Sequence, residues 1–275
     1  MTNISRKTQK INYFKQFIKK WYKKNRRFFP WRRTKNPYYI LVSEIMLQQT
    51  QTDRVKKKYE QFLETFPDWN SLAHAPLRNI LTVWQGLGYN RRALALKKIA
   101  QKVVSDFKGK LPLERGILTT FPGIGTYTAG ALLTFIANQP VIFIETNIRT
   151  VFIHFFFKKQ KSVNDCEIIP LIEKTIDKKN PREWYFALMD YGVILKKHNT
   201  SLNKKSAHYT KQSRFKGSNR EVRGKILKLL ISEKKMTESD LIQKLQENPK
   251  KVRKNVKDLL KEKLILEKKG KLCIA

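Results

Sequence analysis

The segment FPGIGTYTAGA, from Phe121 to Ala131, combines the features of a phosphate-binding turn. Gly123 and Gly125 follow a proline, and glycine permits a positive φ and leaves no Cβ between the backbone and a ligand. An apolar run follows, so free N–H groups and the hydroxyls of Thr126 and Thr128 are expected at a helix N-terminus, which favours an anion. An ordinary corner between two helices is the alternative interpretation.

A second group with chemical potential is the carboxyl of Glu44. On a helix through Tyr38–Gln51, Glu44 shares a face with Ile40 and Leu47, at i−4 and i+3. Desolvation on an apolar face raises the pKa of a carboxyl group, so this side chain could hold a proton near neutral pH and act as a general acid. The alternative is a solvated surface glutamate.

Helical patterns that could position these groups recur along the first two hundred residues. Ile11–Arg27 predicts a basic amphipathic helix, and strict apolar alternation is absent from the windows that follow. The sequence therefore predicts a mainly α-helical body. The further helical windows are Tyr38–Glu64, Trp69–His74, Pro76–Gln85, Arg91–Asp106, Leu113–Thr120, Thr126–Ala137, Asn147–Phe157, Asn164–Lys174 and Asn180–Lys197.

Composition changes near residue 200, which divides the chain into three predicted parts. Residues 1–200 form the main domain, 201–217 a basic linker with Lys204 and Lys205, and 218–275 a separate C-terminal unit. Three helical segments followed by a strand–turn–strand pattern make this last unit resemble a winged helix. Its third helix, Pro249–Lys261, carries Lys254 and would enter a DNA groove. A brace or a protein-contact module is the alternative.

Bulk composition indicates a polyanionic partner inside a reducing compartment. The chain has 275 residues, with 58 Lys and Arg against 22 Asp and Glu, for a net charge of +36. A lysine-rich proteome would also raise the charge. The two cysteines lie far apart, no apolar run approaches membrane-spanning length, and the N-terminus has no signal-peptide core. We expect a cytoplasmic, nucleoid-associated monomer that does not bind membranes.

The ordered set of motifs resembles the helix-hairpin-helix DNA glycosylases, a superfamily that includes endonuclease III, and specifically its adenine-specific MutY branch. The resemblance covers residues 10–200 and implies a two-lobed helix-hairpin-helix glycosylase fold. The motifs in order are FPWR at 29–32, PY at 37–38, VSEIMLQQTQ at 42–51, WQGLGY at 84–89, the glycine turn at 121–131 and IETNIR at 144–149.

The resemblance assigns catalytic roles to four residues. Glu44 would protonate adenine at N7 and then activate water, while Glu145 would face the cation that develops at the sugar C1′. The family has Asp where this chain has Glu145, which leaves three outcomes open: a shifted backbone, an altered base specificity or a weakened enzyme. Asn147 would hydrogen-bond near this carboxylate. Tyr127 replaces the nucleophilic lysine of bifunctional relatives, so hydrolysis without strand cleavage is expected.

The same resemblance places other residues against the DNA bases. Arg32 would line the adenine pocket, with Leu47 on the Glu44 face, and Gln48 would offer amide groups to base edges. Gln49 and Tyr89 would insert into or stack against the bases while the target base is flipped out. For Tyr89, core packing in a tight turn is the alternative.

Two family features are missing from the sequence. The four cysteines that bind an iron–sulfur cluster would fall near Lys196, Asn203, Ser206 and Gln212, so no cluster is expected and no metal ligand is assigned. Lys204 and Lys205 would instead reach phosphates. The family hairpin often holds a monovalent cation through backbone carbonyls, which Gly123–Gly125 permits.

The C-terminal domain that recognises oxidised guanine is also missing, which opens the question of the opposite base. We expect a monofunctional base-excision-repair glycosylase acting on double-stranded DNA, removing adenine mispaired with guanine or oxoguanine. A thymine or uracil mismatch glycosylase on the same scaffold and a non-catalytic mismatch-binding protein are the alternatives.

Overall fold

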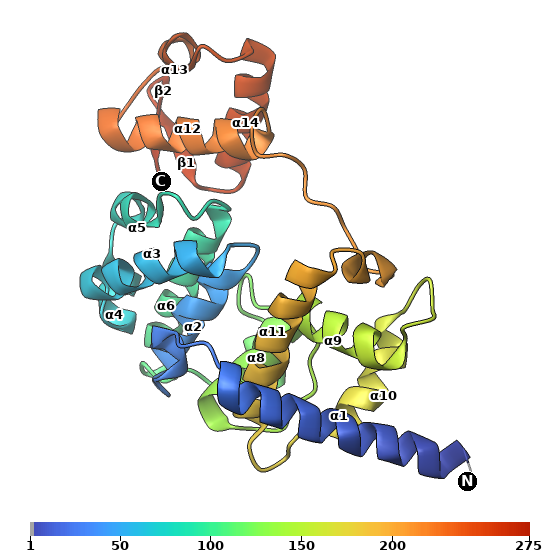
Figure 1. Ribbon diagram of the computed structural model, residues 1–275. Coiled ribbons are helices and arrows are strands. Elements are labelled where there is room, and N and C mark those ends of the chain that lie inside the picture. The colour runs from blue at the N-terminus through green and yellow to red at the C-terminus, as the bar shows by residue number, and fades with distance from the viewer. Residues whose placement is uncertain (1–2) are drawn as a thin grey trace. The chain divides into compact units, whose positions relative to one another are not determined.

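The computed structural model describes residues 3–275 and is mainly helical (Figure 1). Its chain divides into two compact units, each built from separate stretches of sequence. The first unit contains the chain up to Asn36, Leu113–Thr119 and Ile124–Lys211. The second contains Pro37–Pro112, Thr120–Gly123 and Gln212–Ala275. The predicted boundaries near residues 200 and 218 stay a prediction.

Helices of the first unit pack around aromatic side chains. Phe14 is fully buried, and its ring lies 5.3 Å from that of Phe152 and 5.8 Å from that of Trp184. These three residues come from α1, α9 and α11, which places the N-terminal turn of α9 on a rigid base. The elements are α1 Asn3–Asn25, η1 Pro30–Arg32, α7 Arg115–Leu118, α8 Thr126–Ala137, α9 Thr146–Phe156, α10 Asp165–Thr175, α11 Pro181–His198 and η2 Leu202–Lys205.

The second unit begins with a group of helices, α2 to α6, whose core includes Trp84, Phe62 and Tyr38. Its C-terminal part consists of α12 to α14 and the antiparallel hairpin β1–β2, in which Ile265 pairs with Ile274. The elements are α2 Pro37–Leu47, α3 Thr52–Thr65, α4 Trp69–His74, α5 Leu77–Trp84, α6 Arg91–Phe107, α12 Asn219–Glu233, α13 Glu238–Leu245, α14 Pro249–Lys261, β1 Ile265–Lys268 and β2 Lys271–Ile274.

The predicted helical body is confirmed, and so is the order of three helices and a hairpin at the C-terminus. The side chain of Thr237 caps α13, because it accepts a hydrogen bond from the N–H of Asp240. The winged-helix interpretation of these elements stays a prediction.

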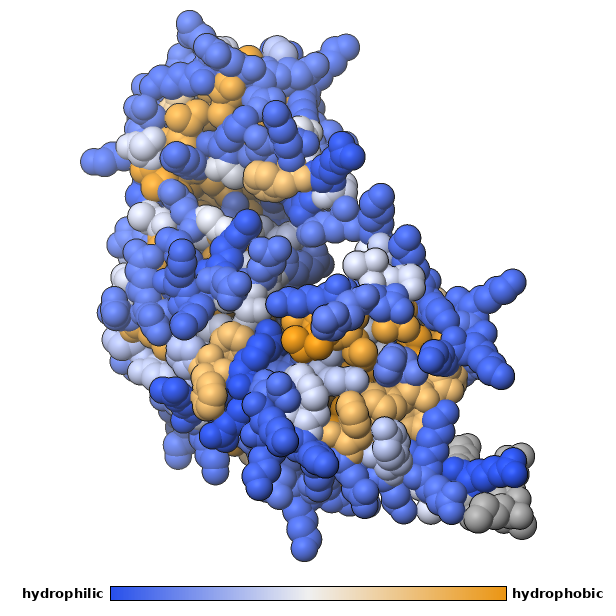
Figure 2. Space-filling model, in the orientation of Figure 1, coloured by the Kyte–Doolittle hydropathy of each residue, from blue (hydrophilic) through white to orange (hydrophobic). Residues whose placement is uncertain are grey.

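The window Tyr38–Glu64 was predicted as one helical region, which is wrong. The helix ends at Leu47 and a new one starts at Thr52, because Gln49 adopts a left-handed conformation with φ of 55°. In the same way, Leu113–Thr120 contains only the short helix Arg115–Leu118. Figure 2 shows hydrophilic side chains over most of the face it draws, as a net charge of +36 implies.

Candidate active site

Helix α2 buries one carboxyl group. Ile40 and Ile45 on this helix are buried, and the Glu44 side chain between them is itself buried, with 7% of the residue exposed. Leu47 is the last residue of the helix and is half-exposed. Glu44 is therefore buried rather than solvated, on a helix that is shorter than expected, and its role as an acid stays a prediction.

The turn after α2 connects two of the predicted site segments. The amide of Gln48 donates a hydrogen bond of 3.0 Å to the carbonyl of Gly123, so the QQTQ turn is tied to the glycine turn. Gln49 has the left-handed backbone described above, and its side chain is exposed. A non-glycine residue in this conformation is strained and is held by its surroundings.

A buried guanidinium that the sequence analysis missed organises this turn. Arg92 donates to the carbonyls at the end of α2 and to those of the turn at 86–89, and burial lowers its pKa to about 10. The sequence did not indicate Arg92 because charged side chains are rarely buried in the protein interior. Its spacing from Leu96, Ile99 and Val103 on the buried face of α6 was the available signal. Its acceptors include Ile45 O at 3.0 Å, Met46 O at 2.8 Å, Gln48 O at 2.5 Å, Leu87 O at 3.0 Å, Gly88 O at 2.9 Å and Thr50 Oγ1 at 3.0 Å.

Tyr89 projects from the turn that Arg92 holds. Its φ is 48°, its side chain is half-exposed, and its hydroxyl accepts hydrogen bonds from Arg220, at 2.9 Å, and from the amide of Gln212. The ring is therefore not part of the core, in contrast to the core-packing alternative. Partners from residues 212–220 were not expected from the sequence.

The glycine turn has the geometry that its sequence predicts. Gly123 has φ of 79°, where a side chain would be strained, and a Cβ there would lie 3.3 Å from that of Ala95. Gly125 is the N-cap of α8, and no heavy atom lies within 4 Å of a Cβ placed on it. Thr126 is exposed, Thr128 is buried, and the ring of Tyr127 packs edge-on against Phe143 at 5.7 Å.

Glu145 is the N-cap of α9, and its carboxylate turns back onto its own helix. Oε1 accepts from the N–H groups of Asn147, at 2.8 Å, and Ile148, at 2.9 Å, while Oε2 accepts from the Asn147 amide at 3.1 Å. Desolvation raises the pKa of Glu145, against the opposing effects of these N–H donors and of Lys196 and Arg149. The longer side chain still caps the helix, so the predicted contact with Asn147 is present.

Close packing fixes the position of Asn147. Gly192 of α11 lies so near that a Cβ there would be 2.4 Å from the Asn147 carbonyl oxygen. The Asn147 Oδ1 atom is buried and finds no hydrogen-bond partner among the described residues. A glycine inside a long helix was the signal that could have indicated this close approach.

Arg32 is committed to an ion pair. Its two terminal nitrogens each lie 2.9 Å from an oxygen of Asp190, whose side chain is fully buried, and Arg27 binds the same carboxylate at 2.7 Å. The Arg32 guanidinium also lies 4.4 Å from the ring of Phe186. Its role in an adenine pocket therefore stays a prediction, and its structural role was not anticipated.

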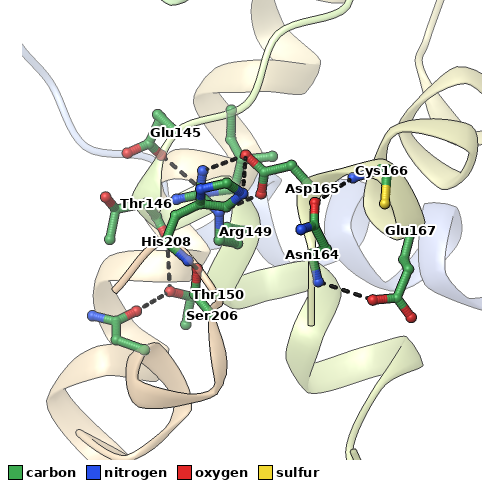
Figure 3. A network of polar contacts seen from close by, with 12 residues as sticks. Glu145, Thr146, Arg149, Thr150, Asn164, Asp165, Cys166, Glu167, Ser206 and His208 are labelled. Atoms are coloured by element: carbon green, nitrogen blue, oxygen red, sulfur yellow. Dashed lines mark hydrogen bonds and ion pairs between the residues drawn. The ribbon is translucent and has the colours of Figure 1, made fainter. Parts of the chain in front are cut away.

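Of the four positions aligned with cluster cysteines, Asn203 and Ser206 belong to a polar network (Figure 3), whereas the Gln212 amide donates to the Tyr89 hydroxyl. The Asn203 side chain accepts a hydrogen bond from Thr150, and a parallel bridge joins Ser206 to Val163. Arg149 binds Asp165 through two hydrogen bonds of 2.6 and 2.7 Å, and His208 lies 3.7 Å from the same carboxylate. Hydrogen bonds thus hold this loop against α9 and the start of α10.

Metal-binding groups do not gather in the part of the chain that the structure describes, where no three His, Cys, Asp or Glu side chains form a metal site. Cys166 is exposed and Cys273 is buried. The expectation of a cluster-free protein and that of a monovalent cation at Gly123–Gly125 both stay predictions.

The lysines predicted to contact DNA differ in exposure and in whether the side chain is already hydrogen-bonded. Lys204 is exposed, whereas the ammonium of Lys205 donates to the carbonyl of Lys158 at 2.7 Å. On α14, Lys254 is exposed on the side opposite the buried Val252 and Val256.

Comparison with known proteins defines the class. Residues 42–169 match the family described as HhH-GPD superfamily base excision DNA repair protein. Glu44, Tyr127, Glu145 and Asn147 all lie in this range. Among residues 3–275, no helix has both the length and the apolar character needed to cross a membrane.

Individual relatives include glycosylases of two specificities. An adenine DNA glycosylase from Buchnera aphidicola subsp. Baizongia pistaciae is 37% identical over 187 residues, which are 66% of this chain and 52% of the relative. A thymine/uracil-DNA glycosylase from Methanothermobacter thermautotrophicus is 28% identical over 198 residues, which are 71% of this chain and 89% of the relative. The chain thus spans about half the length of the adenine-specific relative.

Solved structures share the fold. A thermostable thymine-DNA glycosylase matches with a TM-score of 0.63 and 27% identity, over 68% of this chain and 88% of that one. A trapped endonuclease III–DNA covalent intermediate matches with a TM-score of 0.58 and 18% identity, over 75% and 90%. The predicted glycosylase fold is confirmed.

Proposed function

We propose that this protein is a monofunctional DNA N-glycosylase that removes adenine mispaired with guanine or oxoguanine. The observation that carries the proposal is the burial of Glu44 on the apolar helix α2, inside the residues that match the superfamily. A carboxyl group in this environment is suited to deliver a proton to a purine nitrogen. The adenine-specific relatives support adenine as the base.

The proposed reaction uses two carboxyl groups. Glu44 gives its proton to adenine N7 as the glycosidic bond breaks, and the bond electrons leave with the base. The Glu145 carboxylate stabilises the positive charge that remains on the sugar. Water then adds at C1′ and gives its proton to the Glu44 carboxylate, which yields free adenine and an abasic site.

Tyr127 sets the expected product. A lysine amine at this position would form a Schiff base with the sugar and lead to strand cleavage, whereas a phenol cannot. We therefore expect an intact strand that contains an abasic site.

Double-stranded DNA with a mismatched or damaged base is the proposed partner. The charge of +36 supports binding to a polyanion, and the open face of Gly125 at the start of α8 leaves room for a phosphate. We also propose that the protein acts as an intracellular monomer without an iron–sulfur cluster. Mass measurement under native conditions and iron analysis test these two points.

A second candidate is excision of thymine or uracil from mismatches with guanine. One observation favours it: this chain matches 89% of the thymine/uracil glycosylase, but 52% of the Buchnera adenine glycosylase. The burial of Glu44 supports adenine in this proposal, because departure of a purine is assisted by a positioned acid.

The test is single-turnover base release from duplexes with A·G, A·oxoG, T·G and U·G pairs, followed by alkali to cleave abasic sites. We expect adenine release that Glu44→Gln abolishes. Release of thymine or uracil alone would show that a pyrimidine, and not adenine, is the substrate. Binding without base release from any duplex would show that the protein binds mismatches without catalysis.

A further inference from the structure

The second unit contains a groove in which only Gln49 and Tyr89 have an expected role, while its other wall has none. It has a volume of about 730 Å³ and lies between the turns of Gln49 and Tyr89 on one side and residues 212–231 on the other. Ligand sites typically have volumes of about 300–1,000 Å³. The segment Gln212–Arg220 thus forms a wall of a cavity large enough for a flat organic ring.

The chemistry of the walls suits a nucleobase. Gln49 and Gln212 carry side-chain amides, which both donate and accept hydrogen bonds, as base edges require. Phe215, on the same wall, is 61% exposed, and an exposed aromatic ring in a basic protein can stack on a base. Arg220 and Arg54 supply positive charge beside these groups.

The wall is held in place by specific contacts. Arg220 donates to the Tyr89 hydroxyl at 2.9 Å and to the carbonyl of Ser213 at 2.6 Å. Lys251 of α14 binds the carbonyl of Gly217. The segment is therefore ordered before any ligand enters, which lowers the entropic cost of binding.

Arg78 secures the helix behind this wall. From α5 it donates to the carbonyls of Leu230, at 2.9 Å, Ile231, at 2.6 Å, and Lys234, at 3.0 Å. These are unpaired acceptors at the C-terminus of α12, so one guanidinium caps the helix and joins it to the lobe that carries Tyr89.

We propose that residues 212–220, together with Gln49 and Tyr89, bind the unpaired base in the strand opposite the excised base. The inference rests on the proposed glycosylase function, because excision requires that the target base leave the helix. Its former partner is then left with exposed hydrogen-bonding edges. The amides of Gln49 and Gln212 offer hydrogen bonds to those edges beside Arg220, and Phe215 supports the ring.

A nucleobase fits this groove better than a phosphate does. A phosphate site needs donors alone, whereas the amides of Gln49 and Gln212 present oxygen acceptors as well. Cationic side chains and the Glu221 carboxylate both line the groove, so the amide acceptors, rather than the charge, are what favours a base.

The test measures equilibrium binding of the Glu44→Gln protein, which does not turn over, to three duplexes. Each has an abasic analogue at the target position, and opposite it guanine, oxoguanine or a second abasic analogue. We expect Arg220→Ala to weaken binding to the two base-containing duplexes about 10-fold, the scale of one lost base contact, and to leave the third unchanged.

Two further variants in the same background complete the design. Phe215→Ala removes an exposed ring that the fold does not need, and should weaken the same two duplexes about 5–10-fold through lost stacking. Arg214→Ala removes an exposed charge from the same segment without touching the groove, and should affect all three duplexes equally.

Each outcome decides the matter. An equal loss for all three duplexes in Arg220→Ala, or no loss, would overturn the base site and leave at most a phosphate contact. Opposite-base discrimination that depends on Arg220, in a wild-type protein that releases no base, would keep the groove and reject the proposed enzyme. Base release without any opposite-base discrimination would do the reverse.

Discussion

Two regions that carry predicted site residues, one in each compact unit, are organised by opposite charges. The turns at 48–51 and 86–89 are organised by the Arg92 cation, which donates to backbone carbonyls, whereas the start of α9 is organised by the Glu145 anion, which accepts from backbone N–H groups. The Arg92 guanidinium is charged at neutral pH, with a pKa of about 10. Burial raises the pKa of Glu145, so its charge is maintained at a cost.

This difference separates stability from reactivity. Arg92 donates to carbonyls of both turns and so ties them together, although burial lowers its pKa and its charge, like that of Glu145, carries a desolvation cost. A desolvated Glu145 carboxylate opposes folding when ionised, but this state can stabilise a cation on the sugar. We infer that Arg92 fixes the conformation of the two turns. The start of α9 instead keeps a carboxylate whose ionisation costs folding free energy but serves catalysis.

Loss of Arg92 should have the largest effect. Arg92→Met keeps the length of the side chain but leaves several buried carbonyls without a donor, and should lower the free energy of unfolding by at least about 3 kcal/mol. Urea denaturation gives this value. Arg91→Ala, next to it but exposed, should change stability by less than about 0.5 kcal/mol. Equal effects of the two variants would show that Arg92 is not the frame of the turns.

Movement of Asn147 should have the next largest effect. Gly192→Ala places a methyl 2.4 Å from the Asn147 carbonyl, so α9 or α11 must shift, at a cost of about 1–3 kcal/mol. Base release should fall more than about 10-fold, because sites of this kind need positions accurate to about 0.5 Å.

Gly116→Ala is the matched control for this change. A Cβ at Gly116 would make an ordinary 3.6 Å contact with Glu114, so stability and rate should stay close to those of the wild type. Normal base release from Gly192→Ala would contradict the view that the α9 terminus is precisely placed for catalysis.

Glu145→Gln should separate the effect of this residue on fold stability from its effect on base release. The amide oxygen can still accept from the backbone N–H groups, and its NH₂ can donate to the unpaired Oδ1 of Asn147 after that amide rotates. At pH 7 we expect stability equal to or greater than that of the wild type, with base release reduced at least about 100-fold. Thermal unfolding and single-turnover kinetics measure the two effects.

The pH dependence of this variant follows from the direction of the shift. Because the pKa of Glu145 is raised in the folded state, this group contributes stability below its unfolded pKa, and the contribution is lost as pH rises through the folded pKa. The stability advantage of Glu145→Gln should therefore grow with pH and vanish in acid. A variant that loses stability at every pH would show that the ionised carboxylate stabilises the fold.

The sequence predicted segments better than contacts. Helical periodicity placed α8 and α14 with correct bounds, and the motif set identified the superfamily, because both depend on local residue patterns. Periodicity did not predict the break at Gln49, because the left-handed residue is a glutamine and not a glycine. The tertiary contacts that select this conformation come from Arg92, which lies more than forty residues away in sequence.

The least predictable features join distant parts of the chain. Asp190 has no assigned role in the sequence analysis, yet it is a fully buried partner of Arg27 and Arg32. Tyr89 was placed by resemblance, but its partners Gln212 and Arg220 lie in a segment expected to be a linker. Pairings of this kind depend on three-dimensional packing and leave no periodic pattern in one sequence.

The smallest predicted effect concerns the loop at the former cluster positions. Lys204 is exposed, whereas the ammonium of Lys205 is bonded to the Lys158 carbonyl. We therefore expect Lys204 to contact a phosphate and Lys205 to contribute less. Lys204→Ala should lower the slope of log affinity against log salt by about 0.9, the value for one phosphate contact, and Lys205→Ala should lower it less. Binding titrations at roughly 50 to 200 mM salt give both slopes. Unchanged slopes in both variants would mean that the network of Figure 3 holds the loop away from DNA, and that hydrogen bonding there serves only to stabilise the α9 terminus.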